Sequence, residues 1–187
     1  MQESWLSLSR EVDMFVSDLF ADMDKFMDSG GQVLWAIAVL LFVMWTLIFE
    51  RIWYLRGTVS SDIGLAKSSW QNRSDRASKR ARQVREKLIS EVGLKIDQNV
   101  MMIKTLVALA PLFGLLGTVT GMIVVFDVMA YTGGGDAKAM AGGVSKATIP
   151  TMSGMVAALS GVFGLTIVEK NAERKKGVLE NSLNMEQ

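Results

Sequence analysis

The sequence contains no cysteine and no histidine. Without cysteine, disulfides, thiol catalysis and cysteine-ligated metal sites are excluded. The absence of histidine removes the commonest general base and metal ligand. No nucleophile–base pair or metal cluster can be assembled from the remaining side chains, so we expect neither an enzyme nor a bound cofactor or metal.

Charge is also missing from three long stretches. Residues 29–49, 105–126 and 147–168 carry no charged side chain, although 21% of the chain is charged. Each stretch has the length of about 20 residues that a helix needs to cross a hydrocarbon core about 30 Å thick. Buried helices of soluble proteins are rarely so long and so free of charge. The sequence therefore predicts an all-α membrane protein with transmembrane helices at 30–49, 105–126 and 147–168.

The charges that remain are unevenly distributed. Residues 1–29 hold seven acidic and two basic side chains, whereas residues 50–104 hold twelve basic and six acidic ones. Cytoplasmic segments are enriched in lysine and arginine. We therefore expect the N-terminus outside and the C-terminus inside: an outer segment 1–29, a cytoplasmic helical region 50–104 that extends the flanking spans, an outer loop 127–146 and a cytoplasmic tail 169–187. No basic segment precedes the first span, so a cleaved signal peptide is not expected.

The first 29 residues have the pattern of an amphipathic helix that ends at Ser29-Gly30-Gly31. Its apolar side chains recur every three or four residues and share one helical face, at Leu8, Val12, Phe15, Leu19, Met23 and Phe26. This face could lie on the outer membrane surface. Packing against a partner protein is an equal alternative.

Two further segments invite functional interpretations that we do not favour. The basic run 73–87 could bind nucleic acid or lipid, but a solvated helix face that obeys the positive-inside rule explains it better. The glycine-rich residues 131–146 lack the lysine–threonine pair of a phosphate-binding loop. We interpret them as a flexible turn between two antiparallel spans, and we expect no nucleic-acid partner.

The second and third spans are rich in small residues, whereas the first span has large apolar and aromatic side chains typical of a helix that faces lipid. Lipid tails are as apolar as leucine, so close backbone packing at small residues drives helix association in bilayers. The helix-packing candidates are Gly114, Gly117, Gly121, Gly154 and Gly161. The two spans could simply pack on each other, but small residues occur on more than one face. A larger assembly is favoured.

Hydroxyl groups are the main polar side chains within these two spans. A membrane threonine or serine can bond back to a carbonyl one turn earlier, so a lone hydroxyl carries little information. Thr118 lies beside two glycines, and Thr151 follows Pro150, which we place in the first turn of its span, where a missing donor costs little. If the helices line a cavity, Thr118 and Thr151 are its polar surface at depth. Spacing alone leaves both interpretations open.

These motifs resemble a known family. The pattern APxxGLxGTVxGM at residues 110–122, followed by a short loop and GGVSKATIPTMSGMVAALSGVFGLTIVEKN, is similar to the signature of the MotA/TolQ/ExbB family. The likeness is greatest to the ExbB branch, in particular to the short variants that serve a second TonB system. It covers residues 30–175 in topology and is sharp over 105–170.

The resemblance implies a multi-pass protein of the Gram-negative inner membrane, with residues 1–29 and 127–146 in the periplasm. Five subunits would ring a central pore lined by the second and third spans, and two copies of a single-span partner, ExbD, would stand inside. Proton flow would drive motion that energises TonB for uptake of iron–siderophore and similar substrates. The pore threonines of the family fall on Thr118 and Thr151.

Two features of the chain qualify that expectation. Many relatives carry glutamate five residues before the third-span threonine, whereas this sequence has Lys146, a charge reversal at the pore mouth. Moving a proton through hydrocarbon needs a titratable group at depth, and the three uncharged stretches contain none. If protons cross, a partner must supply the acid, with Thr118 and Thr151 as its hydrogen-bonding neighbours.

Two alternatives remain. A TolQ-like subunit of the Tol-Pal envelope motor would share these features, whereas a MotA-like stator would be expected to have four spans. From a different functional class, the chain could be a non-conducting scaffold that clusters membrane proteins through its glycine faces.

Overall fold

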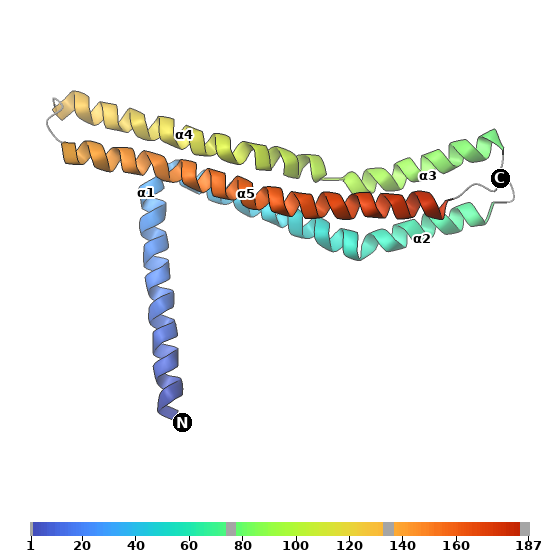
Figure 1. Cartoon of the computed structure of the whole chain (residues 1–187), viewed down its shortest axis with the longest axis horizontal. Helices are drawn as coiled ribbons and strands as arrows, with labels where there is room; N and C mark the ends of the chain where they lie inside the picture. Colours follow the sequence, from blue (N-terminus) through green and yellow to red (C-terminus); the bar gives the residue numbers. More distant parts are fainter. Residues whose placement is uncertain (1, 74–77, 133–136, 184–187) are drawn as a thin grey trace. The chain divides into compact units, whose positions relative to one another are not determined.

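The structure is a computed structural model that describes residues 2–73, 78–132 and 137–183. Its regular structure over these residues is entirely helical. The five helices, in chain order, are α1 (Gln2–Arg56), α2 (Thr58–Gln71), α3 (Lys79–Asp97), α4 (Val100–Thr132) and α5 (Ala137–Ser182) (Figure 1). Three helical stretches are long and apolar enough to cross a membrane, namely Gly30–Arg56, Lys79–Tyr131 and Met140–Ser182. The prediction of an all-helical chain with three candidate spans is confirmed.

The first helix is interrupted where the sequence predicted its end. Gly31 has φ 64° and ψ −160°, a backbone region that essentially only glycine occupies. Residues 2–30 and 32–56 are therefore two helical segments. In the first segment Met23 and Phe26 are exposed, while the side chains of Leu8, Val12, Phe15 and Leu19 lie outside the described residues.

Two local expectations differ from the structure. Residues 127–132 and 137–146, expected to form a loop, are helical, because α4 continues to Thr132 and α5 begins at Ala137; Gly133 to Asp136 lie outside the described residues. Pro150 is therefore well inside α5 and not in a first turn. Proline has no backbone N–H, so the helical hydrogen bond to the carbonyl four residues earlier is missing. Residues 137–149 contain no proline, so the helix can begin at Ala137, before the uncharged stretch that starts at residue 147.

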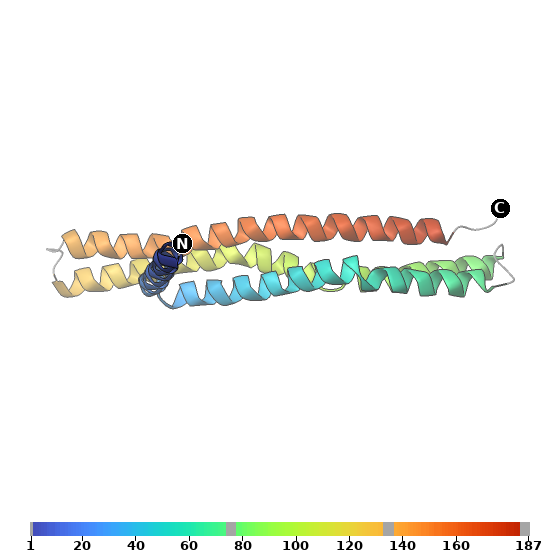
Figure 2. The ribbon, with the colours of Figure 1, turned by 90° about the horizontal axis from the view of Figure 1, so that it is seen from below.

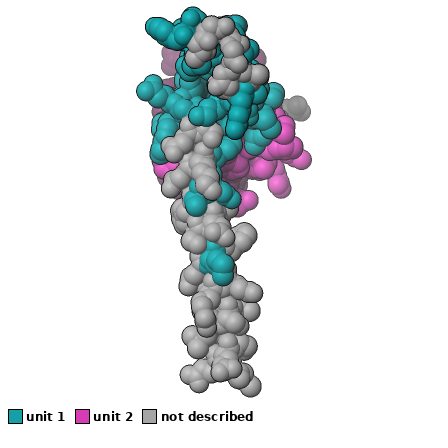
Figure 3. Space-filling view, turned by 90° about the vertical axis from the view of Figure 1, so that its left-hand side faces the viewer, with its two compact units in different colours: residues 1–39, 110–156 teal, residues 40–109, 157–187 magenta. Residues whose placement is uncertain are grey.

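The chain divides into two compact units (Figure 3). The first unit contains residues 1–39 and 110–156, and the second contains residues 40–109 and 157–187. In the first unit the later part of α4 and the beginning of α5 run antiparallel, side by side (Figures 1 and 2). This helix pair carries both of the expected pore threonines.

The second unit has the larger apolar core. Its buried side chains come from the end of α1, from α2 and α3, and from parts of α4 and α5, and include Met44, Ile48, Trp70, Ile96, Ile103 and Leu179. Ser78 caps α3, because its hydroxyl accepts a hydrogen bond from the Ala81 N–H at 3.1 Å. Most described residues of the charged region 50–104 are helical; the exceptions are Gly57, Asn72, Arg73, Ser78, Gln98 and Asn99.

Span one does not face only lipid. Leu34, Ile37, Leu40, Met44 and Ile48 are buried, whereas residues between them are exposed, such as Trp35, Val39 and Phe42. The three-to-four spacing of the buried set gives the helix one face that packs within the chain. The uniformly apolar composition hid this face, because a lipid-facing leucine and a buried one look alike in sequence.

Candidate functional site

In the first unit, glycines of α4 form the surface against which α5 packs. A Cβ on Gly114 would lie 3.0 Å from the Cα of Thr151, and one on Gly121 would lie 2.6 Å from the Cβ of Ala147. A Cβ on Gly117 would overlap the ring of Pro150. The three glycines thus form one continuous groove that accepts the α5 backbone, as small residues do in membrane helix pairs.

The glycines of α5 face other helices of the same chain. A Cβ on Gly154 would lie 2.6 Å from the carbonyl oxygen of Ala110 in α4, within the first unit. In the second unit, a Cβ on Gly161 would lie 2.5 Å from the sulfur of Met44 in α1. The contacts of these glycines are therefore satisfied within one chain, and the glycines by themselves do not require a larger assembly.

Thr151 joins the two helices through a hydrogen bond. Its Oγ1 lies 2.8 Å from the carbonyl oxygen of Gly114. Since a carbonyl oxygen only accepts, the threonine hydroxyl donates this bond. The sequence left open whether this hydroxyl bonds back along its own helix, and in the structure it bonds to the neighbouring helix instead. The absence of a side chain at Gly114 lets the hydroxyl reach the opposite backbone.

Thr118, Thr120, Ser153 and Ser160 bond to their own helix, which is one of the two possibilities that the sequence left open. The Oγ1 of Thr118 donates to the carbonyl of Leu115 at 2.7 Å, and that of Thr120 donates to the carbonyl of Leu116 at 3.0 Å. Ser153 and Ser160 make the same kind of bond at 2.9 and 2.8 Å. These bonds satisfy the hydroxyl donors without a partner protein.

The half-buried Thr118 lies at the edge of an apolar depression. The depression has a volume of about 320 Å³ and is lined by Thr118, Val119, Met122, Ile123 and Phe126 of α4. Thr151 lies on α5. Its hydroxyl bonds to the carbonyl of Gly114 in α4, one turn before Thr118. Within the part of the chain that the structure describes, no hydrogen bond joins the two threonines. Both hydroxyls already donate, so each retains only acceptor capacity.

Lys146 lies beside a groove in the first unit. The groove has a volume of about 350 Å³ and is lined by residues around the α1 interruption and by α4 and α5, among them Gln32, Val33, Thr120, Gly121 and Lys146. Lys146 is exposed, and none of the described acidic side chains forms an ion pair with it. No sequence pattern indicates that residues 30–33 share a groove with Lys146, because that proximity depends on the helix packing.

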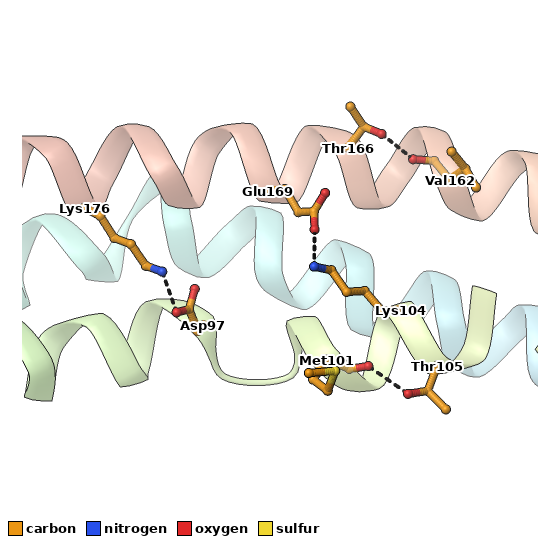
Figure 4. Close-up of polar contacts among 8 residues, drawn as sticks. All are labelled: Asp97, Met101, Lys104, Thr105, Val162, Thr166, Glu169 and Lys176. Atoms are coloured by element: carbon orange, nitrogen blue, oxygen red, sulfur yellow. Dashed lines mark hydrogen bonds and ion pairs between the residues drawn. The ribbon is translucent and has the colours of Figure 1, made fainter. Parts of the chain in front are cut away.

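One ion pair lies where the uncharged part of α4 begins and the uncharged part of α5 ends. In the second unit, Lys104 Nζ lies 2.6 Å from Glu169 Oε1, and Lys176 pairs with Asp97 (Figure 4). Lys104 and Glu169 are the charged residues that bound the two uncharged stretches. The ion pair therefore joins the start of one uncharged stretch to the end of the other. Sequence reasoning used these residues only as boundaries and missed their contact.

Hydroxyls near these ion pairs bond back to their own helices. Thr105 donates to the carbonyl of Met101 at 3.0 Å, and Thr166 donates to that of Val162 at 2.8 Å (Figure 4). The described residues contain no group of three or more acidic side chains that could hold a metal ion. The polar side chains of the three uncharged stretches are hydroxyls together with Gln32 and the indoles of span one, of which Trp45 donates to Ser160 at 3.4 Å.

Comparison with known proteins places these features in context. Residues 60–181 match the model of the MotA/TolQ/ExbB proton channel family. The chain is 46% identical over 61 residues to a putative biopolymer transport protein, ExbB-like 1, of Synechocystis, a match that covers 31% of this chain and 24% of that protein. It is 37% identical over 71 residues to the biopolymer transport protein ExbB of Helicobacter pylori, covering 38% of this chain and 49% of that protein.

A third relative gives the longest of these alignments. The biopolymer transport protein exbB1 of Vibrio cholerae is 32% identical over 97 residues, which is 51% of this chain and 42% of that protein. The chain thus matches less than half of the length of each of these relatives.

Proposed function

Because this chain belongs to the MotA/TolQ/ExbB proton channel family, we propose that it is the ring-forming subunit of an inner-membrane motor driven by the proton-motive force. The motor would contain an ExbD-like single-span partner and would energise TonB for outer-membrane transport of iron–siderophore and similar substrates. The proposed arrangement is a homopentamer with the N-terminus in the periplasm and the C-terminus in the cytoplasm.

The observation that carries the proposal is the chemistry of the spans. The three uncharged stretches, 29–49, 105–126 and 147–168, contain hydroxyls and close-packed glycines but no titratable side chain. A proton that crosses hydrocarbon needs such a group. A subunit of this kind can support proton movement only when a second polypeptide places an acid beside its hydroxyls.

The large exposed area of the spans supports an assembly. Within the most apolar windows of the three candidate spans, only 28, 22 and 28% of the residues are buried by the chain itself. The glycines pack against other helices of the same chain, so they do not by themselves require neighbouring subunits. The exposed apolar faces of α4 and α5 therefore remain for lipid and for neighbouring subunits.

The hydrogen bonds of Thr118 and Thr151 specify what they would do for the acid. Each hydroxyl hydrogen is already donated to a backbone carbonyl, at 2.7 and 2.8 Å respectively. In this state the oxygens can only accept, so they would bind a protonated carboxylic acid in preference to a carboxylate. A carboxylate has no hydrogen to donate. It could accept a hydrogen bond from the Thr151 hydroxyl only if the Thr151–Gly114 bond were broken. We propose that the two threonines favour the neutral form of the partner's acid.

The test compares valine and serine at the two threonines in the complete complex. Thr118→Val and Thr151→Val keep the shape and remove the hydroxyl, so we expect TonB-dependent iron uptake to fall. Thr118→Ser and Thr151→Ser keep the hydroxyl and should retain uptake. Normal uptake in both valine variants would refute the assignment. Complementation of strains that lack ExbB or TolQ distinguishes the TonB client from the Tol-Pal client.

Lys146 is proposed as a residue of the pore mouth. It is exposed beside the groove near the α1 interruption, so its ammonium can attract an anionic group of a partner. Lys146→Glu should then reduce uptake more than the neutral Lys146→Gln. Equal uptake by the two variants would show that the charge at this position has no role.

A further inference from the structure

The α3–α4 junction of the second unit contains an unusual backbone. After α3 ends at Asp97, Gln98 has φ −50° and ψ 138°, and Asn99 has φ 62°. Asn99 is the only described residue other than glycine with positive φ. Its carbonyl accepts the 3.0 Å bond from the Ile103 N–H that opens α4. The two residues form a short break between a charged helix and a candidate span.

A break of this kind leaves carbonyl oxygens at the end of the first helix without partners. Here the partner comes from another helix. The guanidinium of Arg51 in α1 donates from Nη2 to the carbonyl of Lys95 at 2.9 Å and from Nε to the carbonyl of Gln98. A cation at a helix C-terminus also interacts favourably with the helix dipole. Arg51 thus caps α3 from outside.

Burial makes this cap unusual. Arg51 is 1% exposed and is the only buried charged residue among those described. Burying a charge is costly unless the charge is paired or hydrogen-bonded. No carboxylate of the described residues forms an ion pair with Arg51, so the two backbone carbonyls provide its hydrogen-bond acceptors. The guanidinium and the break therefore stabilise each other.

Neighbouring side chains hold Arg51 in place. The ring centroid of Tyr54 lies 4.9 Å from its Cζ, a cation–π contact. The hydroxyl of Tyr54 donates to Asp62 of α2 at 2.8 Å, and Lys95 of α3 pairs with the same carboxylate at 3.2 Å. Helices α1, α2 and α3 are thus joined around the guanidinium.

We propose that Arg51 is a positioning residue that fixes the direction in which α4 leaves the α3–α4 break. Its planar fork binds two carbonyls that belong to the last turn of α3 and to the break itself. Without it, Gln98 and Asn99 would be free to change conformation, and α4 would no longer have one orientation relative to α3.

The mechanical consequence rests on the proposed function. If α4 carries Thr118 of the proton pathway, a fixed junction passes movement between the charged helices and the span. A loose junction absorbs that movement. Arg51 would then affect coupling although it contacts no proton-carrying group.

The absence of cysteine allows a direct distance measurement. Ser90→Cys and Thr105→Cys place spin labels at exposed sites of α3 and α4, on either side of the break. The labelled full-length chain is mixed with excess unlabelled chain, assembled with its partner, and measured by double electron–electron resonance. Arg51→Met removes the cap, whereas Arg51→Lys keeps the charge and loses the fork. Arg56→Met is the matched control, because Arg56 is exposed and makes no described polar contact.

We expect a narrow distance distribution in the parent and in Arg56→Met, a broader one in Arg51→Lys and the broadest in Arg51→Met. Asn99→Gly frees the same backbone by a second route, since glycine occupies positive and negative φ about equally. Added to Arg51→Met, it should broaden the distribution further and lower the proton-driven uptake.

An unchanged distribution in Arg51→Met would overturn the proposal. So would a distribution in the Arg51→Met, Asn99→Gly double variant that is narrower than that of Arg51→Met alone. If Arg51→Met does not assemble, Arg51→Lys decides, and a narrow distribution in that variant overturns the proposal. The spectroscopic result does not depend on proton conduction, so absence of uptake in every variant, the parent included, refutes the proposed function and leaves the positioning role standing.

Discussion

Replacement of Gly154 by alanine should force α4 and α5 apart in the first unit. A Cβ at this position would lie 2.6 Å from the carbonyl oxygen of Ala110 and 2.9 Å from the Cα of Gly114. Both are backbone atoms, so no side-chain rotation relieves the overlap. Ordinary contact begins at 3.4 Å, which requires the helices to separate locally by about 0.8 Å. Overpacking of this kind costs about 1–3 kcal/mol.

The same displacement should break the bond between the helices. The Thr151 Oγ1 to Gly114 O distance of 2.8 Å would become about 3.6 Å, which is beyond a hydrogen bond. Interhelical hydrogen bonds in membranes contribute about 0.6 kcal/mol on average. We therefore expect Gly154→Ala to lower the free energy of unfolding by about 1.5–3.5 kcal/mol.

The assay is unfolding of the detergent-solubilised protein by SDS, followed by tryptophan fluorescence. Gly142→Ala is the matched control in the same helix, because nothing lies within 4 Å of its Cβ. Alanine there should be neutral or stabilising by up to about 1 kcal/mol, since alanine is the better helix former. Thr151→Val isolates the hydrogen bond and should cost less than Gly154→Ala. Equal unfolding free energies for Gly154→Ala and Gly142→Ala would refute the close contact between the helices.

Three further outcomes are expected. Gly31→Ala should lower the free energy of unfolding by about 1–3 kcal/mol in the same assay, because its φ and ψ are reserved for glycine although space is open around it; parent-like stability would contradict a fixed interruption. Lys104→Glu should weaken assembly on native gels by placing two carboxylates together, and the double variant with Glu169→Lys should restore it; a double variant as weak as the single one would show that the pair has no role. Single cysteines at the exposed positions Leu94 and Tyr131 should react with an impermeant maleimide from the cytoplasmic and the periplasmic side respectively, and the reverse pattern would overturn the proposed topology.

The number and place of the candidate spans could be read from the sequence, because the absence of charge over a length of hydrocarbon is a local property. The interruption at Gly31 was equally local, since a Ser-Gly-Gly sequence ends an amphipathic pattern. Most hydroxyl bonds were predictable for the same reason, as each joins residues three or four apart in one helix.

The tertiary structure decided which residues meet. The bond from Thr151 to Gly114, the Lys104–Glu169 ion pair and the cap of Arg51 on α3 join residues far apart in the sequence. Their existence depends on the register and rotation of helices that are apolar nearly all round, so periodicity alone could not indicate it. The sequence therefore determined which segments are long and apolar enough to cross a bilayer. Only the packing of the helices determined which hydroxyls, glycines and charges contact one another.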